Sequence, residues 1–212
     1  MNVLVISGPA SIHLDPARKI LNQSTGTTGA TITAILQKNG FSPTLWQGKD
    51  ASCPVPSGIK ISAEFQTVPE LQLLLAKTNL AQFHAILVPA ALPDYALKST
   101  RDLQGGVLPA GKWPGSLPGL QIELTPGPRI LPTLRDYAPK AKIIGWKWET
   151  DGNMDELREV AEKQIRICRT DGCVLNGPAY GKGYLLMTAD GDSLPCPSPT
   201  ELGHALARYL KN

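Results

Sequence analysis

The sequence has few cysteines, no long hydrophobic run and no cluster of charge, and each absence excludes a class of protein. Four widely spaced cysteines in 212 residues indicate neither a disulfide framework nor a paired-cysteine zinc site. No apolar stretch approaches the roughly 20 residues of a membrane-spanning helix. Because no basic leader precedes Val3–Ile6, we expect a cytoplasmic protein that binds no membrane. The 21 basic and 18 acidic residues are scattered, which argues against nucleic acid as the partner.

Two nucleotide-binding fingerprints are also missing. No Gly-x-Gly-x-x-Gly follows the first apolar run, and no Gly-Lys-Ser/Thr ends a phosphate loop. Gln47 and Gly48 stand where an acidic residue would bind the ribose of NAD. A Rossmann-type oxidoreductase is therefore the last of our hypotheses. His13, His84 and His204 lie in unrelated segments, so neither a metal cluster nor a catalytic triad is indicated.

Short apolar runs alternate with amphipathic segments along the whole chain, and 42% of the residues are hydrophobic, which is typical of a globular protein. The pattern predicts an α/β, Rossmann-like, doubly wound and largely parallel sheet with helices on both faces, in a single domain over 1–212. The predicted strands are 2–7, 43–47, 59–63, 85–88, 120–124, 142–148, 172–176 and 184–188, and the predicted helices are 25–39, 68–80, 130–137, 154–169 and 199–210.

Residues 89–118 interrupt this alternation, because they are rich in proline and glycine and show no period. A loop of this length in a compact domain is usually a lid or a binding flap. It carries Asp94, Tyr95, Lys98 and Lys112. We therefore expect a flap, with a dimerisation insertion at about 96–124.

A candidate phosphate site follows the first predicted strand. Ser24, Thr25, Gly26 and Gly29 open a predicted helix, whose first N–H groups and positive dipole end would receive an anion. The glycines would let a ligand approach closely. The same residues also fit a structural role, with Ser24 as an N-cap and the glycines packing the helix on a strand.

Four segments carry motifs in a fixed order along the chain. The first contains Gly8-Pro9, Asp15-Pro16, Arg18, Asn22, Ser24 and Gly26. The second runs from Val88 to Tyr95, the third is 138–151 and the fourth is 171–176. Together they resemble the phosphopantothenoylcysteine synthetase family, the synthetase half of the DNA/pantothenate metabolism flavoproteins, and the third is close to the eukaryotic-type version in which Phe-Lys-Leu-Glu-Thr-Asp ends a strand. The chain is identified as a divergent stand-alone member.

The resemblance implies a ligase of coenzyme A biosynthesis that joins 4′-phosphopantothenate to cysteine through an acyl-nucleotide intermediate. It implies CTP or ATP as co-substrate and Mg²⁺ to neutralise the triphosphate. The flavin-dependent half of the family has no counterpart here, so no flavin is expected. Because family members commonly dimerise through the flap, the resemblance also implies a homodimer.

The resemblance further implies a role for each matched residue. Asn22 would hold the acyl-nucleotide, and Lys112 would stabilise the charge that develops at phosphorus. Asp15, Arg18 and Asn22 would bind the acid substrate, and Asp94 would bind the metal. The implied nucleotide and phosphate ligands are Gly8, Ser24, Thr25, Gly26, Ala91, Asp94 and Lys147.

One departure from the family and the orientation of one matched residue leave alternatives open. Thr27-Thr28 stands where the family has Lys-Met, which removes a cation near the phosphates. The chain could therefore be a catalytically reduced, nucleotide-binding paralogue with a regulatory role, or a ligase for a different acid. Lys147 lies between two tryptophans, so it either points into the site or faces solvent with Trp146 and Trp148 in the core.

Overall fold

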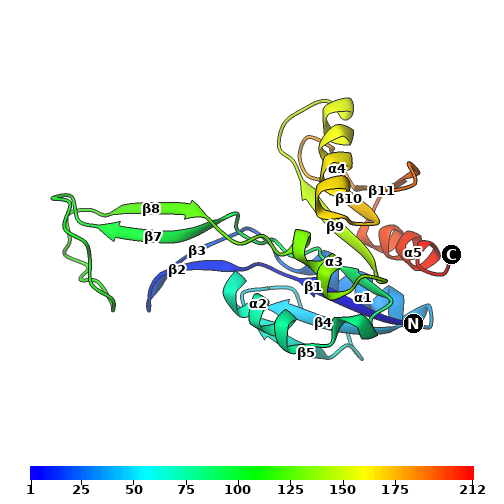
Figure 1. The fold of residues 1–212 in the computed structure, drawn as a ribbon, viewed down its shortest axis with the longest axis horizontal. Helices are drawn as coiled ribbons and strands as arrows, with labels where there is room; N and C mark the ends of the chain where they lie inside the picture. The colour runs from blue at the N-terminus through cyan, green and yellow to red at the C-terminus, as the bar shows by residue number, and fades with distance from the viewer.

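An eight-stranded sheet forms the body of the protein in the computed structural model, which describes residues 1–212 (Figure 1). The strand order is β12-β11-β10-β9-β6-β1-β4-β5, and the six strands from β10 to β5 pair in parallel. The prediction of a largely parallel, doubly wound sheet is confirmed. The strands are β1 Asn2–Ser7, β4 Ser42–Gly48, β5 Ile61–Phe65, β6 Ala85–Leu87, β9 Lys142–Trp148, β10 Gly172–Asn176, β11 Tyr184–Thr188 and β12 Ser193–Cys196.

Helices cover both faces of the sheet because the strands are apolar on both sides. Val3 and Val5 of β1 face a cluster that contains residues of α1 (Thr27–Lys38) and α5 (Pro199–Tyr209). The alternate residues Leu4 and Ile6 face a cluster that contains residues of α2 (Val68–Lys77) and α3 (Leu134–Tyr137). α4 (Met154–Cys168) packs on β10 and β11 on that second face. This period-2 division of one strand between two cores is what a doubly wound sheet requires.

Helix starts follow local chemistry. Asn153 and Glu156 form a capping box at the start of α4, and Thr67 caps α2 by accepting a hydrogen bond from Glu70 N. The short 3-10 turns η1 (Leu80–Gln82) and η2 (Leu131–Thr133) continue the helical segments around α2 and α3. None of the helices is both long and apolar enough to cross a bilayer.

Two hairpins project from the body as an arm, at the end opposite to both termini (Figure 1). We define the arm as residues 11–21 and 95–126: β2 (Ser11–Asp15) with β3 (Arg18–Leu21), and β7 (Tyr95–Arg101) with β8 (Gln121–Pro126). The prediction of an irregular segment over 89–118 was wrong for β7. The sequence analysis also missed β2, β3 and β12, because these strands are short or half-exposed and lack a continuous apolar run.

Gly29 lets α1 lie directly on the end of β1. A Cβ atom at Gly29 would stand 2.1 Å from Ser7 Oγ, and that hydroxyl donates a hydrogen bond to Gly26 O (3.2 Å). The close approach fixes the segment that leads into α1.

We therefore expect Gly29→Ala to destabilise the fold by about 1–3 kcal/mol, because overpacking outweighs the better helix propensity of alanine. Urea unfolding measures the change. Gly115→Ala is the control, since nothing lies within 4 Å of its added Cβ atom. Equal stability of the two variants would contradict the packing argument.

Candidate active site

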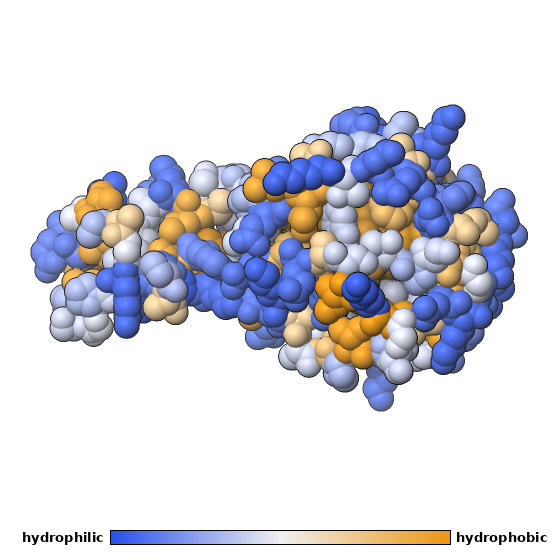
Figure 2. All heavy atoms as spheres, turned by 90° about the horizontal axis from the view of Figure 1, so that it is seen from below, coloured by the Kyte–Doolittle hydropathy of each residue, from blue (hydrophilic) through white to orange (hydrophobic).

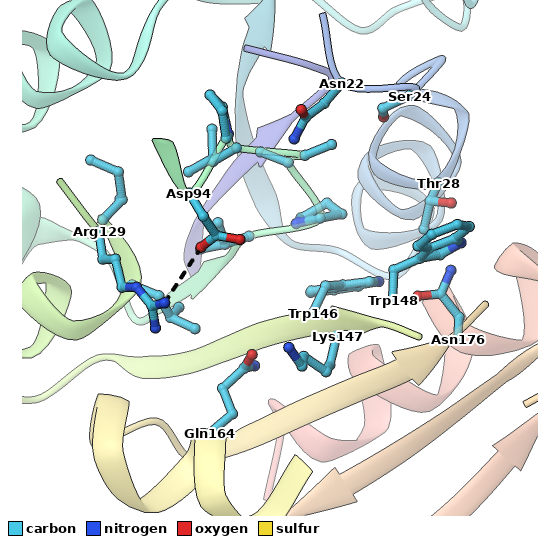
Figure 3. A pocket seen from close by; sticks show the side chains of 18 of the residues that line it. Asn22, Ser24, Thr28, Asp94, Arg129, Trp146, Lys147, Trp148, Gln164 and Asn176 are labelled. Atoms are coloured by element: carbon cyan, nitrogen blue, oxygen red, sulfur yellow. Dashed lines mark ion pairs between the residues drawn. The ribbon is translucent and has the colours of Figure 1, made fainter. Parts of the chain in front are cut away.

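A cleft of about 1160 Å³ opens where the parallel strands end, beside the base of the arm (Figure 3). Its walls come from the segment before α1, the loop after β6, the loop after β8 and the end of β9. This is the sheet edge at which doubly wound folds bind ligands. The lining residues include 21–25, Thr28, 88–94, 128–132, 146–148, Gln164, Cys168 and Asn176.

The start of α1 supplies one wall of the cleft. Asn22, Ser24, Thr25 and Thr28 line it, and Asn22 points its amide into the open space (Figure 3). The N-cap is Gly26, in the left-handed conformation with φ 82°, and no side chain caps the helix. The structural alternative of an N-cap at Ser24 is therefore wrong. Thr27 N donates to Thr25 Oγ1 (3.3 Å). Because no side chain of the N-cap binds the N–H groups that follow, these groups and the positive dipole end remain available to an anion.

Backbone hydrogen bonds join the segment after β1, which contains Gly8, to the loop after β6, which contains Ala91. Ala91 N donates to Gly8 O (3.0 Å), and Ala91 O accepts from Ala10 N (3.0 Å). Gly8 has φ 81°, and a Cβ atom there would stand 3.1 Å from Gly48 N. Gly8 and Gly26 do not line the cleft, whereas Ala91 does.

Asp94 lies at the mouth of the cleft together with Arg129, which the sequence analysis did not single out. Arg129 Nη2 is 3.7 Å from Asp94 Oδ1, and both side chains are about 70% exposed (72% and 70%). The dashed line in Figure 3 marks this pair. Such an exposed, long ion pair contributes little stability, so the carboxylate remains available to a ligand. The only signal for Arg129 in the sequence is a basic residue that follows Pro126-Gly127-Pro128.

The end of β9 shows whether Lys147 points into the cleft or away from it. Lys147 lines the cleft between Trp146 and Trp148, with its Nζ atom 3.0 Å from Glu149 Oε1. The alternative that buries both tryptophans is wrong, because Trp148 is 61% exposed. Trp146 is half-buried, and its indole N–H has no partner within the protein.

Two residues of α4, Gln164 and Cys168, complete the wall and were also missed by the sequence analysis. Gly145 makes room for Gln164, since a Cβ atom at Gly145 would stand 2.6 Å from Gln164 Nε2. Burial raises the pKa of the Cys168 thiol, although the charges of Arg129 and Lys147 oppose the shift. In the sequence, the only indication that Gln164 and Cys168 share one face of a helix is their spacing of four residues.

The three remaining predicted site residues lie on the arm instead of the cleft. Asp15 and Arg18 form an ion pair at the end of the β2–β3 hairpin, and the Asp15 side chain is fully buried. Its carboxylate accepts hydrogen bonds from Ala17 N (2.7 Å) and Trp113 N (3.2 Å). Lys112 is exposed on the loop between β7 and β8. The structure therefore does not bring these residues to the cleft of their own chain.

Asp15 makes the arm sensitive to acid. Burial opposes ionisation of Asp15, but hydrogen bonds from Ala17 N, Trp113 N and Arg18 outweigh it and lower its pKa below the ordinary 3.8. A carboxylate with a lowered folded-state pKa contributes stability above the unfolded pKa and loses it as pH falls through the folded one. We expect the Trp113 amide resonance to keep its position from neutral pH down to about pH 4 and to move only below that. A midpoint between pH 5 and 7 would contradict this account.

Comparisons with known proteins agree on one family. The DNA/pantothenate metabolism flavoprotein C-terminal domain matches residues 1–185. The coenzyme A biosynthesis bifunctional protein CoaBC of Thermococcus kodakarensis is 29% identical over 175 residues, which are 82% of this chain and 40% of that protein. CoaBC of Escherichia coli is 28% identical over 222 residues, covering 97% of this chain and 50% of that protein. The chain thus spans about half, or less, of the length of these curated relatives.

Solved structures show the same fold. The DNA/pantothenate metabolism flavoprotein from Streptococcus pneumoniae superposes with a TM-score of 0.86 at 21% identity, covering 100% of this chain and 98% of that one. A Cab2 mutant in complex with phosphopantothenate-cysteine superposes with a TM-score of 0.73 at 19% identity, covering 99% of this chain and 87% of that one.

Proposed function

We propose that this chain, which belongs to the DNA/pantothenate metabolism flavoprotein C-terminal domain family, is a nucleotide-dependent ligase. The ligase would join 4′-phosphopantothenate to cysteine. The observation that carries the proposal is the cleft, which assembles Asn22, Asp94 and Lys147 beside an uncapped helix start. The similarity to CoaBC proteins, and to a Cab2 mutant that holds phosphopantothenate-cysteine, supports the choice of substrates.

The proposed reaction has two steps. The carboxylate of 4′-phosphopantothenate attacks the α-phosphate of CTP or ATP, forming an acyl-nucleotide as the bond to pyrophosphate breaks. The amine of cysteine then attacks the acyl carbon, and the nucleoside monophosphate leaves. The Asn22 amide is placed to donate hydrogen bonds to the acyl-nucleotide, and the N–H groups at the start of α1 to hold a phosphate.

Arg129 and Lys147 are the two basic side chains that line the cleft, and Asp94 is the acidic one. Both cations lie beside carboxylates at the surface, so each can turn to an anionic ligand at low cost. Asp94 fits Mg²⁺, because this ion is commonly bound by one or two carboxylates together with substrate phosphates. When bound there, Mg²⁺ would neutralise charge on the triphosphate.

Release of pyrophosphate tests the proposal. With 4′-phosphopantothenate, cysteine, Mg²⁺ and CTP or ATP, we expect release that requires the pantothenate substrate. Asn22→Ala should lower kcat by about 10²-fold, since it removes a donor to the intermediate. Asn79→Ala is the matched control, because Asn79 is exposed, lies outside the cleft and caps nothing through its side chain. Equal loss in both variants would contradict the role of Asn22.

The catalytically reduced paralogue remains the second candidate, and one observation favours it. Thr27 and Thr28 leave the start of α1 without a basic side chain, so phosphate affinity there depends on backbone groups and Thr hydroxyls. Binding of CTP or ATP without release of pyrophosphate would support this candidate over the ligase.

We also propose that the chain acts as a homodimer in which the arm of one copy completes the cleft of the other. Lys112 lies between β7 and β8 on the arm, which projects from the body (Figure 1). The cleft is lined by residues of the body and of the segments at the base of the arm. Figure 2 shows apolar side chains on the arm as well as on the body, and such an exposed apolar surface is typical of an interaction site. The exposed large apolar residues of the arm are Ile20, Leu21, Tyr95, Leu103, Val107, Leu120, Ile122 and Leu124.

Mixing two impaired variants tests the shared site. Lys112→Ala and Asn22→Ala each damage a different part of it, so a mixed dimer contains one cleft with both residues intact. After exchange of subunits at equal concentrations, we expect roughly a quarter of the wild-type activity, by random pairing of the two copies in a two-fold dimer. A mixture no more active than its components would contradict sharing, and sedimentation velocity would show whether dimers form.

A further inference from the structure

The loop at the end of the arm is fastened to the other hairpin through one residue. We call residues 102–120, between β7 and β8, the tip loop. Trp113 N donates to Asp15 Oδ2 (3.2 Å), and Arg18 donates to Trp113 O through both Nη1 and Nη2 (3.3 Å each). Both backbone polar groups of Trp113 are therefore bound by one ion pair, 95 or more residues away along the chain.

The burial of Trp113 indicates that this contact is part of the folded structure of the arm. Trp113 is 5% exposed and is the one buried residue of the tip loop, whereas Lys112 and Pro114 on either side are exposed. The indole N–H of Trp113 donates to Pro109 O (3.1 Å), which closes the loop around Lys112. The tip loop has no helix or strand of its own, so the position of Lys112 depends on how Trp113 is held.

The Asp15 carboxylate, whose side chain is fully buried, is engaged too fully to act as a ligand for substrate. Besides Trp113 N, the Asp15 carboxylate accepts from Ala17 N and Arg18 N (2.7 Å each) and from the Arg18 guanidinium. A buried charge is tolerated only when its partners satisfy it in this way. A substrate that displaced one of these donors from Asp15 would leave that donor without a partner.

We propose that Asp15 and Arg18 are positioning residues: they clamp Trp113 and thereby fix where the adjacent Lys112 is presented to the reaction. This inference rests on the proposed function, through the role assigned to Lys112. It differs from the substrate-binding role that the resemblance implies for the same two residues, because the clamp acts only through the tip loop.

Limited proteolysis tests the clamp without any activity. Trypsin cleaves after Lys112, at the peptide bond whose N–H group is bound by Asp15. We expect Asp15→Asn to speed this cleavage at least roughly tenfold, because the tip loop opens more often. Glu123→Gln is the matched control: it breaks the Lys98–Glu123 ion pair of the same arm and leaves Trp113 untouched. Circular dichroism confirms that both variants are folded.

Kinetics then test the positioning role. Asp15→Asn and Arg18→Lys should each lower kcat at least roughly tenfold while leaving KM for the nucleotide unchanged. In a Lys112→Ala background, the same substitutions should lower kcat no further, since residues that act through one group are not additive. Residues that bind substrate independently would instead show effects that multiply.

The outcomes separate the inference from the proposed function. Unchanged cleavage in Asp15→Asn overturns the clamp, even in an active ligase. Faster cleavage with multiplying kinetic effects overturns the positioning role and restores direct binding of substrate. A wild-type chain without turnover overturns the proposed function and the positioning role together, whereas the clamp itself is still decided by the proteolysis.

Discussion

Parallel pairing of β1, β6 and β9 is the constraint on which the cleft depends. Because β1 pairs with β6 and β6 pairs with β9 in the same direction, their carboxyl ends meet at one edge of the sheet. Each strand then delivers a different kind of group there. β1 leads to the β2–β3 hairpin and the start of α1, β6 leads to Asp94, and β9 carries Lys147 next to its last residue. Segments more than 100 residues apart become the walls of one site.

The strength of each local signal decided how much could be predicted. The fully buried run Val3–Ile6 and the amphipathic α4 have strong periods, and the structure shows both where the sequence predicted them. β7 is half-exposed, so its sequence has no apolar pattern that predicts a strand. Its partner strand β8 lies about 25 residues further along the chain. Asn22, Asp94 and Lys147 were found through family motifs. Arg129 and Gln164 were not, because their place in the cleft arises only from packing.

The arm and the body perform separate parts of one task in this account. Under the proposed function, the body would hold the nucleotide and acid, while the arm carries Lys112 on a loop that the Asp15–Arg18 ion pair holds in place. Such a loop can hold a charged side chain in place without any helix or strand, provided that the contact at Trp113 is rigid. In the same arrangement, Asp15 and Arg18 lie on the arm and do not line the cleft, although they belong to the same motif as Asn22.

The central claim is that the carboxylate of 4′-phosphopantothenate attacks the α-phosphate of a nucleotide, and transfer of isotope tests it most directly. With ¹⁸O in that carboxylate, the account predicts one ¹⁸O atom in the phosphate of the released CMP or AMP, seen as a shift of its ³¹P resonance. Label in inorganic phosphate with release of a nucleoside diphosphate would contradict the account, since it would mean attack on the γ-phosphate. Product formed without any transfer of label would contradict it as well.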